Sequence, residues 1–328
     1  MRYEDAVFYK NLAPALAFFI LFCCTCIGTF CDLVLKISRK EYRIMFRRYS
    51  RPLRGIVPCV LIAGVLSCGG PEKAVEEKLS DHVLFFSNFE KGVDALSSAG
   101  STLAEIDGAL TTHHITEGVW ETEKTSDGYI SFSEGSGALI YKAKDNFPYL
   151  GRKPWAGSVA FWMGVNPETE LKANYPEPFH VGKKWDDAVI FVDFDKKHGP
   201  PALRFGCYPD KLGEVSDEMV EKRVIRVENV NWKSSEWHHI VITWENFNSG
   251  KADAEWALYV DGKERGRKKN LKQDISWDLD AQTIRFNHYK YQGKIDDIAV
   301  FDVSLDSKEV AYLFKPRIPL NNLLKKDR

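Results

Sequence analysis

The sequence has no excess of charge of either sign and almost no cysteine beyond its first 68 residues. Its 45 lysine and arginine residues balance 46 acidic residues, which leaves a formal net charge of -1. Proteins that bind nucleic acid through electrostatics carry a basic domain or stripe, so this balance argues against that class. Six of the seven cysteines precede Gly69, and Cys207 is the only one after it. No disulfide can therefore form within the later part of the chain.

The sequence also lacks the short motifs of the common hydrolases. It contains no Gly-x-Ser-x-Gly elbow, no His-Glu-x-x-His helix and no phosphate-binding glycine loop. Its densest acidic cluster lies within Lys211–Glu221, where a solvated, charged loop accounts for the composition. A catalytic pair can still assemble from distant strands, so hydrolysis remains a third hypothesis.

What the chain does contain is a series of short strands. The segment Ser158–Val165 alternates its side chains between two faces, which is the period of a β-strand. The segments Trp237–Trp244 and Ala254–Val260 predict a hairpin. About a dozen such strands and a single helix predict an all-β fold, a two-sheet antiparallel sandwich. Between two of the strands, the polar and proline-rich residues Asn166–Asp187 predict a long loop.

The end of this region predicts a closing strand and a short helix. Lys294–Phe301 is rich in apolar and β-branched residues with a partial period of two. Asp306 is a suitable N-cap, and Glu309 lies three residues later, where it completes a capping box. Pro316 then ends the helix.

Three stretches, in order, resemble bacterial laminin G-like domains. They are Gly157–Pro167, Trp237–Arg267 and Gln292–Phe314. Domains of this family are jelly-roll sandwiches of the concanavalin A-like lectin/glucanase class, and the resemblance extends over Val83–Phe314. Glucanases on this fold use a Glu-x-Asp-x-x-Glu or Glu-x-Asp-x-Glu strand motif, with one carboxylate as nucleophile and another as acid/base. The sequence has neither motif, so we expect a binding domain that is not an enzyme.

Two apolar runs precede the region of resemblance. Leu12–Cys31 is uncharged and long enough to span a membrane. Ser38–Arg54 then carries seven lysine or arginine residues against one glutamate, which is typical of a cytoplasmic flank. The second run, Gly55–Leu66, has the length of a signal-peptide core.

The second run ends in a sequence that resembles a bacterial lipoprotein processing box, Val65-Leu66-Ser67-Cys68. If translation starts at Met45, residues 45–68 form a signal peptide, Cys68 is lipidated, and residues 1–44 are an upstream extension of the gene. Alternatively, Leu12–Cys31 is a transmembrane anchor and Cys68 is an ordinary thiol. Both interpretations predict an exported domain, anchored to the membrane at the cell envelope.

The rest of the chain divides into a tether, a domain and a tail. Residues 69–82 include the charged stretch Pro71–Ser80, which we interpret as a tether with no core-forming residues. Residues 83–316 form the predicted sandwich domain, and residues 317–328 form a basic tail.

The resemblance also implies a structural calcium ion. Relatives of this class often bind Ca²⁺ through an aspartate of the final strand and through carbonyl groups near the first strand. Asp296 is the matching position here, with Asn88 and Glu90 as possible co-ligands. Ca²⁺ takes six to eight oxygen ligands, several of which backbone carbonyls can supply. The alternative is that Asp296 caps a turn or accepts hydrogen bonds from loop amides.

Aromatic residues in the predicted loops are candidates for binding sugars. A flat ring stacks on the apolar face of a sugar, and nearby acidic groups hold its hydroxyls. Trp185, followed by Asp186 and Asp187, is the preferred candidate, together with Tyr208 and Tyr175. The tryptophans in predicted strands are assigned to the core: Trp162, Trp237, Trp244 and Trp256.

These observations favour a non-catalytic binding module outside the cytoplasm. The leading hypothesis is recognition of a polysaccharide or glycoconjugate through the loops around Trp185 and Tyr208. The alternative is a protein–protein or adhesion module in a cell-envelope complex. A glycoside hydrolase or lyase without the usual motif is the third possibility.

Overall fold

The computed structural model describes residues 71–90, 92–106, 128–211, 213, 215–315 and 324. The predicted membrane segments, Cys68 and most of the basic tail lie outside these residues. In the part of the chain that is described, no helix is both long enough and apolar enough to cross a membrane. Residues Gly69–Arg328 form one compact unit.

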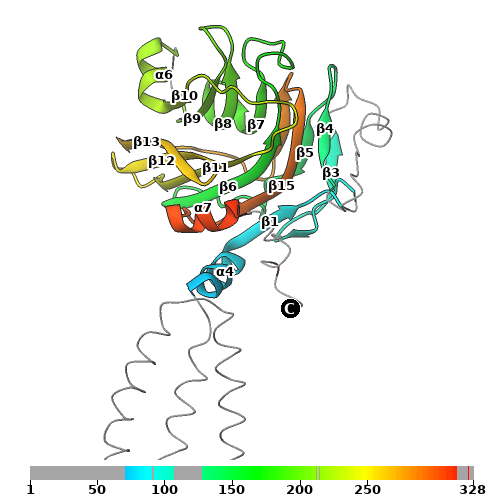
Figure 1. Cartoon of the computed structure of the whole chain (residues 1–328). Coiled ribbons are helices and arrows are strands. Elements are labelled where there is room, and N and C mark those ends of the chain that lie inside the picture. The colour runs from blue at the N-terminus through cyan, green and yellow to red at the C-terminus, as the bar shows by residue number, and fades with distance from the viewer. Residues whose placement is uncertain are drawn as a thin grey trace, which may run out of the picture. The chain divides into compact units, whose positions relative to one another are not determined.

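This unit is built from two antiparallel sheets (Figure 1), which confirms the predicted jelly-roll sandwich. Sheet A has the strand order β13-β12-β11-β6-β15-β1-β2, and β4 also pairs with β15. Sheet B has the order β10-β9-β8-β7-β14-β5-β3. In each sheet one half pairs strands that are consecutive in the sequence, β11 to β13 in sheet A and β7 to β10 in sheet B. The other half joins strands from distant parts of the chain, such as β6 with β15 and β7 with β14.

The strands of sheet A are β1 (Val83–Ser87), β2 (Ser97–Ser98), β4 (Ile130–Phe132), β6 (Trp155–Gly164), β11 (His238–Phe247), β12 (Ala254–Val260), β13 (Lys263–Leu271) and β15 (Gly293–Phe301). The strands of sheet B are β3 (Ala104–Ile106), β5 (Leu139–Lys142), β7 (Glu177–Lys184), β8 (Asp187–Asp195), β9 (Ala202–Tyr208), β10 (Val224–Val227) and β14 (Thr283–Tyr289). The helices are α4 (Pro71–His82), α6 (Asp217–Arg223) and α7 (Ser307–Phe314).

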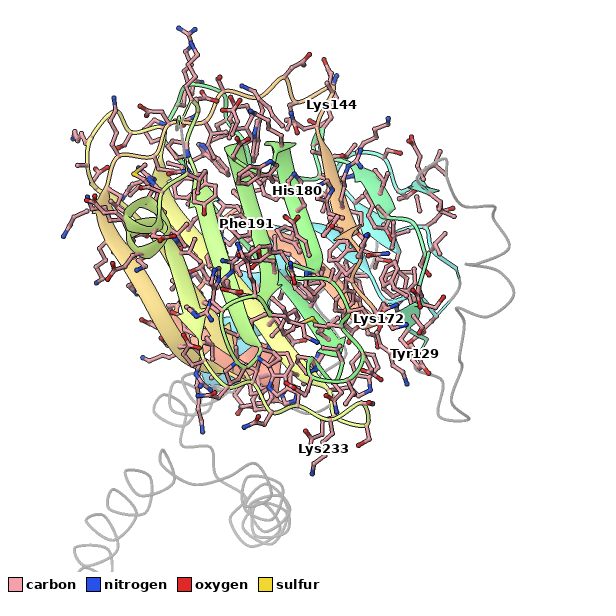
Figure 2. The ribbon with its side chains drawn as sticks, turned by 90° about the horizontal axis from the view of Figure 1, so that it is seen from above. Tyr129, Lys144, Lys172, His180, Phe191 and Lys233 are labelled. Atoms are coloured by element: carbon pink, nitrogen blue, oxygen red, sulfur yellow. The ribbon has the colours of Figure 1, made fainter. Side chains whose placement is uncertain are left out.

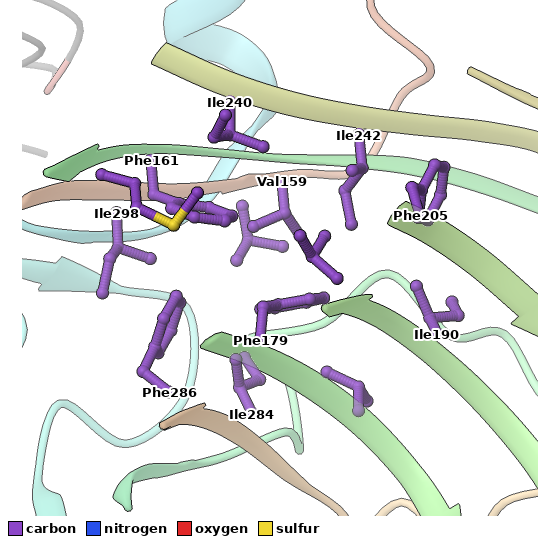
Figure 3. Close-up of a cluster of buried hydrophobic side chains, with 14 of the residues drawn as sticks. Val159, Phe161, Phe179, Ile190, Phe205, Ile240, Ile242, Ile284, Phe286 and Ile298 are labelled. Atoms are coloured by element: carbon purple, nitrogen blue, oxygen red, sulfur yellow. The ribbon is translucent and has the colours of Figure 1, made fainter. Parts of the chain in front are cut away.

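The hydrophobic core fills the space between the two sheets, as Figure 3 shows. Alternation along each strand sends every second side chain inward. Sheet A contributes Val159 and Phe161 from β6, and sheet B contributes Phe179 from β7 and Phe205 from β9. All four are fully buried.

The predicted hairpin is confirmed, and two of its tryptophans belong to the core. β11 pairs with β12 so that Trp244 lies opposite Trp256, and both are fully buried. Trp237 was assigned to the core, and this was wrong. It precedes β11 and leaves 36% of its surface exposed.

The predicted closing strand and capped helix are also confirmed. Asp306 accepts hydrogen bonds from the backbone N–H groups of Lys308 and Glu309, and the Glu309 carboxylate accepts one from the Asp306 N–H. The helix α7 packs Val310 and Leu313 against apolar side chains on the outer face of sheet A. That face is therefore covered.

The structure differs from the expected tether. Residues 71–82 form helix α4, and Leu79 is 1% exposed in the cluster beneath α7. Lys78 forms an ion pair with Glu309, and the Tyr312 hydroxyl donates a hydrogen bond to Glu76 over 3.2 Å. The composition suggested a tether because two large apolar side chains, Val75 and Leu79, are a weak signal among many charges. Both nevertheless pack in the apolar cluster that contains Val310 and Leu313 of α7.

Two predicted loops also contain regular structure. Within Asn166–Asp187, residues 177–184 form β7, with Phe179 and Val181 pointing to the core. Pro178 is compatible with a strand because it lies near the first residue. Within Lys211–Glu221, helix α6 begins after Ser216, whose side chain accepts a hydrogen bond from the Met219 N–H. The prediction of a single helix was therefore wrong.

We expect the substitution Leu79→Ala to lower the free energy of unfolding by about 3 kcal/mol, because it removes a fully buried side chain. Urea denaturation followed by circular dichroism measures this change. The control is Leu103→Ala, since Leu103 is 63% exposed, and we expect a change within about 0.5 kcal/mol. Equal stability of both variants would mean that α4 does not dock.

Candidate functional site

Trp185, the preferred sugar-binding candidate, lies at the tip of the β7–β8 hairpin. The turn between Lys184 and Asp187 consists of only Trp185 and Asp186, and Trp185 is 63% exposed. Asp186 pairs with Lys184 at 3.0 Å. Asp187 accepts a hydrogen bond from the backbone N–H of Lys211 over 2.8 Å. Both acidic groups thus already have partners within the hairpin region.

Tyr208 lies at the same end of sheet B but is buried. It is opposite Val189 in the β8–β9 pairing, close to the hairpin that carries Trp185. Its ring is 4% exposed and packs against Phe191 with a centroid separation of 5.3 Å, under Val220 of α6. Burial raises the pKa of Tyr208 to about 12. The buried ring is therefore not available to stack on a sugar.

Tyr175 lies at the opposite end of sheet B, just before β7. The guanidinium of Arg204 lies 4.9 Å from the centre of its ring, and its hydroxyl is 3.4 Å from Nδ1 of His198. The structure thus brings Trp185, Asp186, Asp187 and Tyr208 to one end of the sheet and places Tyr175 at the other. The five residues do not form one site.

A polar cleft of about 400 Å³ opens at another place, where β4 meets the start of β15. Sequence reasoning did not identify it. Its walls come from β4 and the following turn, from the loop after β6 and from the first residues of β15. The lining residues are Ser131, Phe132, Ser133, Glu134, Gly164, Thr169, Glu170, Lys172, Ser234, Gln292, Gly293 and Lys294.

Charged groups in the cleft are held by short contacts. Lys172 donates a hydrogen bond to Glu134 over 2.5 Å, and this bond lowers the pKa of the Glu134 carboxyl. The Glu170 carboxylate accepts a hydrogen bond from the backbone N–H of Asn166 over 2.5 Å. Hydroxyl groups of Ser131, Ser133, Thr169 and Ser234 complete a lining of hydrogen-bonding side chains.

Aromatic rings lie next to the cleft. The Nζ of Lys294 is 4.7 Å from the centre of the Tyr129 ring, and Tyr129 contacts Trp237 edge-on at 5.5 Å. The Trp237 ring also approaches Gly164, which lines the cleft. Figure 2 shows Tyr129 and Lys172 together at one edge of the molecule, away from His180 and Phe191 over the middle strands.

The outer face of sheet B carries a buried network of acids and arginines. Arg204 on β9 binds Asp193 on β8 through two parallel hydrogen bonds, from Nε and Nη2. Burial raises the pKa of the Asp193 carboxyl, and the Arg204 charge opposes this effect. Both side chains are nearly inaccessible to solvent.

Asp195, two residues along β8, is the centre of the same network. It is 3.1 Å from Nδ1 of His198, forms an ion pair with Arg226, and accepts a hydrogen bond from the backbone N–H of Lys197. Burial alone would raise the pKa of Asp195. The hydrogen bonds from His198 and Arg226, with the charges of Arg204 and Arg226, outweigh burial and lower this pKa to about 2.

Glu177, His180 and His288 form a second polar cluster in sheet B. Nδ1 of His180 lies 2.8 Å from Oε1 of Glu177, and the rings of His180 and His288 stack at 3.9 Å. Burial raises the pKa of Glu177 to about 8 and lowers that of His180 to about 4, and the nearby charge of Arg285 adds to the second shift. In the absence of another ligand, both groups are therefore mostly uncharged at neutral pH.

Of the proposed calcium ligands, Asp296 lies on β15, and Asn88 and Glu90 follow the end of the neighbouring strand β1. Ser87 is opposite Ile298, so Asn88 follows at the level of Asp297. Asp296 accepts a hydrogen bond from the Asp297 N–H over 2.7 Å, at an irregularity in the pairing of β15 with β6. Glu90 is exposed. The calcium site remains a prediction.

Residues 181–311 match a laminin G family model (Laminin_G_3) of the concanavalin A-like lectin/glucanases superfamily. This match supports the resemblance found in the sequence over that range. No curated protein sequence matches the chain.

Several solved structures share the fold. The receptor-binding domain of botulinum neurotoxin C/D mosaic serotype is 12% identical, with a TM-score of 0.52 over 73% of this chain and 52% of that one. The binding domain of serotype D is 13% identical, with a TM-score of 0.52 over 74% and 52%. The serotype D ligand-binding domain in complex with N-acetylneuraminic acid is 12% identical, with a TM-score of 0.50 over 74% and 53%. This chain thus spans about half the length of each, and the likeness concerns the fold alone.

We expect Asp195→Asn to lower the free energy of unfolding by about 3 kcal/mol at neutral pH, because it removes a buried carboxylate that forms ion pairs with Arg204 and Arg226. The folded-state pKa of Asp195 is below its ordinary value of 3.8. The stabilisation is therefore complete above pH 3.8 and is lost as the pH falls toward 2.

Urea denaturation of both proteins at several pH values measures this difference. The control is Asp280→Asn, since Asp280 pairs with Lys144 on the surface and is 70% exposed, and we expect a change within about 0.5 kcal/mol. A stability difference between wild type and Asp195→Asn that grows on acidification would contradict this account.

Proposed function

We propose that this domain is a non-catalytic module that binds a polysaccharide or glycoconjugate outside the cytoplasm. The observation that supports this most is the polar cleft between β4 and β15. Its hydroxyl, carboxylate and ammonium groups come together from segments far apart in the sequence. A sugar presents many hydroxyl groups of both hydrogen-bonding kinds, and such a lining can satisfy them.

The neighbouring aromatic pair adds the second element of sugar recognition. Trp237 is partly exposed and approaches the cleft at Gly164. A ring in that position can pack against the apolar face of a sugar whose hydroxyls point into the cleft. The cleft also contains Lys172 and Lys294, which can compensate the negative charge of an acidic sugar.

The comparisons support a binding module at a coarse level. The matched family model describes a lectin/glucanase superfamily, and one protein of similar fold has been solved in complex with N-acetylneuraminic acid. Because sequence identity is low, these facts concern the class of fold and do not identify the ligand of this chain.

The outer face of sheet B favours binding over hydrolysis. Asp193 and Asp195 lie two residues apart on β8, the spacing that directs two carboxylates to one side of a strand. Both are buried, and each is bound to arginine. A glycosidase pair must reach the glycosidic bond, and one member must carry a proton to donate. These two acids are instead used to hold β8, β9 and β10 together.

The exposed hairpin of Trp185 is a second possible contact for the same ligand class. Its ring is the most exposed tryptophan among the described residues and lies beside Asp186 and Asp187. We also propose that the domain is anchored to the membrane, through a lipid on Cys68 or through Leu12–Cys31, and that calcium binds at Asp296.

A glycan array tests the proposal with residues 69–328, in the presence of calcium and again with EDTA. We expect specific binding by the wild-type domain. The substitution Glu170→Ala should reduce it about tenfold or more, since one lost charge-assisted hydrogen bond is worth about 1.5–3 kcal/mol. The substitution Trp185→Ala is tested in parallel and removes the exposed ring of the β7–β8 hairpin, the second possible contact.

Each outcome identifies a different site. Loss of binding with Glu170→Ala alone supports the cleft, and loss with Trp185→Ala alone moves the site to the hairpin. Loss with EDTA makes a metal ion part of recognition. A folded domain that binds no glycan would contradict the proposal and favour a protein partner, which pull-downs from envelope extracts would then identify.

A further inference from the structure

The cluster of Glu177, His180 and His288 is assembled by an irregularity in sheet B. β14 pairs with β7 so that Arg285 lies opposite His180, and this register shifts between Phe286 and Tyr289. Within the shift, Asn287 has a φ of 56°, in the left-handed region. A bulge of this kind re-aims the side chains next to it. It brings the His288 ring face to face with that of His180.

The three side chains bring metal-binding donor atoms close together. One nitrogen from each imidazole and one carboxylate oxygen all lie within 4.8 Å of one another. Ligand atoms about 2.0–2.1 Å from a tetrahedral ion would be about 3.4 Å apart. Oε1 of Glu177 and Nδ1 of His180 are already 2.8 Å apart. Small side-chain rotations, chiefly of the two stacked imidazoles, would therefore bring all three donors to bonding distance.

We propose that Glu177, His180 and His288 form a binding site for a zinc-class transition-metal ion on sheet B. Two imidazole nitrogens and one carboxylate oxygen suit such an ion, whereas Ca²⁺ and Mg²⁺ take oxygen ligands. This site is separate from the predicted calcium site, whose residues lie on β15 of sheet A and just after β1. It is also independent of the proposed glycan binding.

The surroundings of the cluster suit a fixed ion. Glu177 and His180 are more than nine-tenths buried, and His288 is half-buried. Their backbones belong to paired strands, which restricts the movement of the donors. Three protein ligands leave a fourth position for water or for a group from another molecule.

Metal analysis of the full chain in detergent tests this site. The chain is incubated with excess zinc, passed through a gel filtration column and analysed for metal by mass spectrometry. We expect Glu177→Gln and His288→Gln to retain about one zinc ion fewer per chain than wild type. The cysteines of residues 1–68 are present in every variant, so any zinc that they hold cancels in the comparison.

His198→Gln is the matched control, because His198 lies on the same sheet but is exposed and pairs with Asp195. We expect it to retain as much zinc as wild type. Replacement of zinc by Co²⁺ gives a second measurement, since the visible absorption of cobalt bound by imidazole should disappear in Glu177→Gln. Equal metal content in wild type and both cluster variants would overturn the proposal and leave a hydrogen-bonded structural cluster.

Thermal unfolding of wild type keeps the test valid if a variant fails to fold. An ion that binds only the folded state raises the melting temperature, by several degrees when its concentration is about 100 times Kd. We expect this rise with zinc and none with magnesium. An unchanged melting temperature of the wild-type sandwich in zinc would overturn the proposal without reference to any variant.

Discussion

The apolar contact between the two sheets is the constraint on which the rest of the structure depends. It uses one face of the central strands, through side chains such as Phe161 of β6 and Phe179 of β7. Function must therefore use the outer faces, the edges or the turns. The outer face of sheet A is also apolar, and α7 and α4 cover it. This leaves the outer face of sheet B and the strand ends.

The outer face of sheet B is unusual because it buries ionisable groups. The ion pair of Asp193 with Arg204 connects β8 to β9, and that of Asp195 with Arg226 connects β8 to β10 across β9. Glu177 and His180 remain mostly uncharged on the same sheet. Buried polar groups are costly unless they are paired. A structural role explains the arginine network, since each acid has a cationic partner. The cluster of Glu177, His180 and His288 instead has the donor set of a metal site. The two clusters therefore differ in the role that their chemistry suits.

The sequence predicted those parts of the fold that depend on local patterns. The β11–β12 hairpin alternates regularly, and the capping box of α7 needs only Asp306 and Glu309. β7 was missed because it lies in the polar, proline-rich stretch Asn166–Asp187, where only Phe179 and Val181 show the inward apolar alternation. The cleft and the histidine cluster could not be predicted, because each joins segments far apart in the sequence. The bulge that turns His288 toward His180 has no local signature beyond Asn287.

The central claim is that this sandwich recognises a glycan in the polar cleft between β4 and β15. Hydrogen–deuterium exchange of the domain, with and without a glycan that it binds, tests this claim most directly. The account predicts slower exchange in residues 131–134 and 292–294, which line the cleft, and unchanged exchange at the hairpin of residues 184–187. Protection confined to that hairpin, with no change in the cleft, would contradict it.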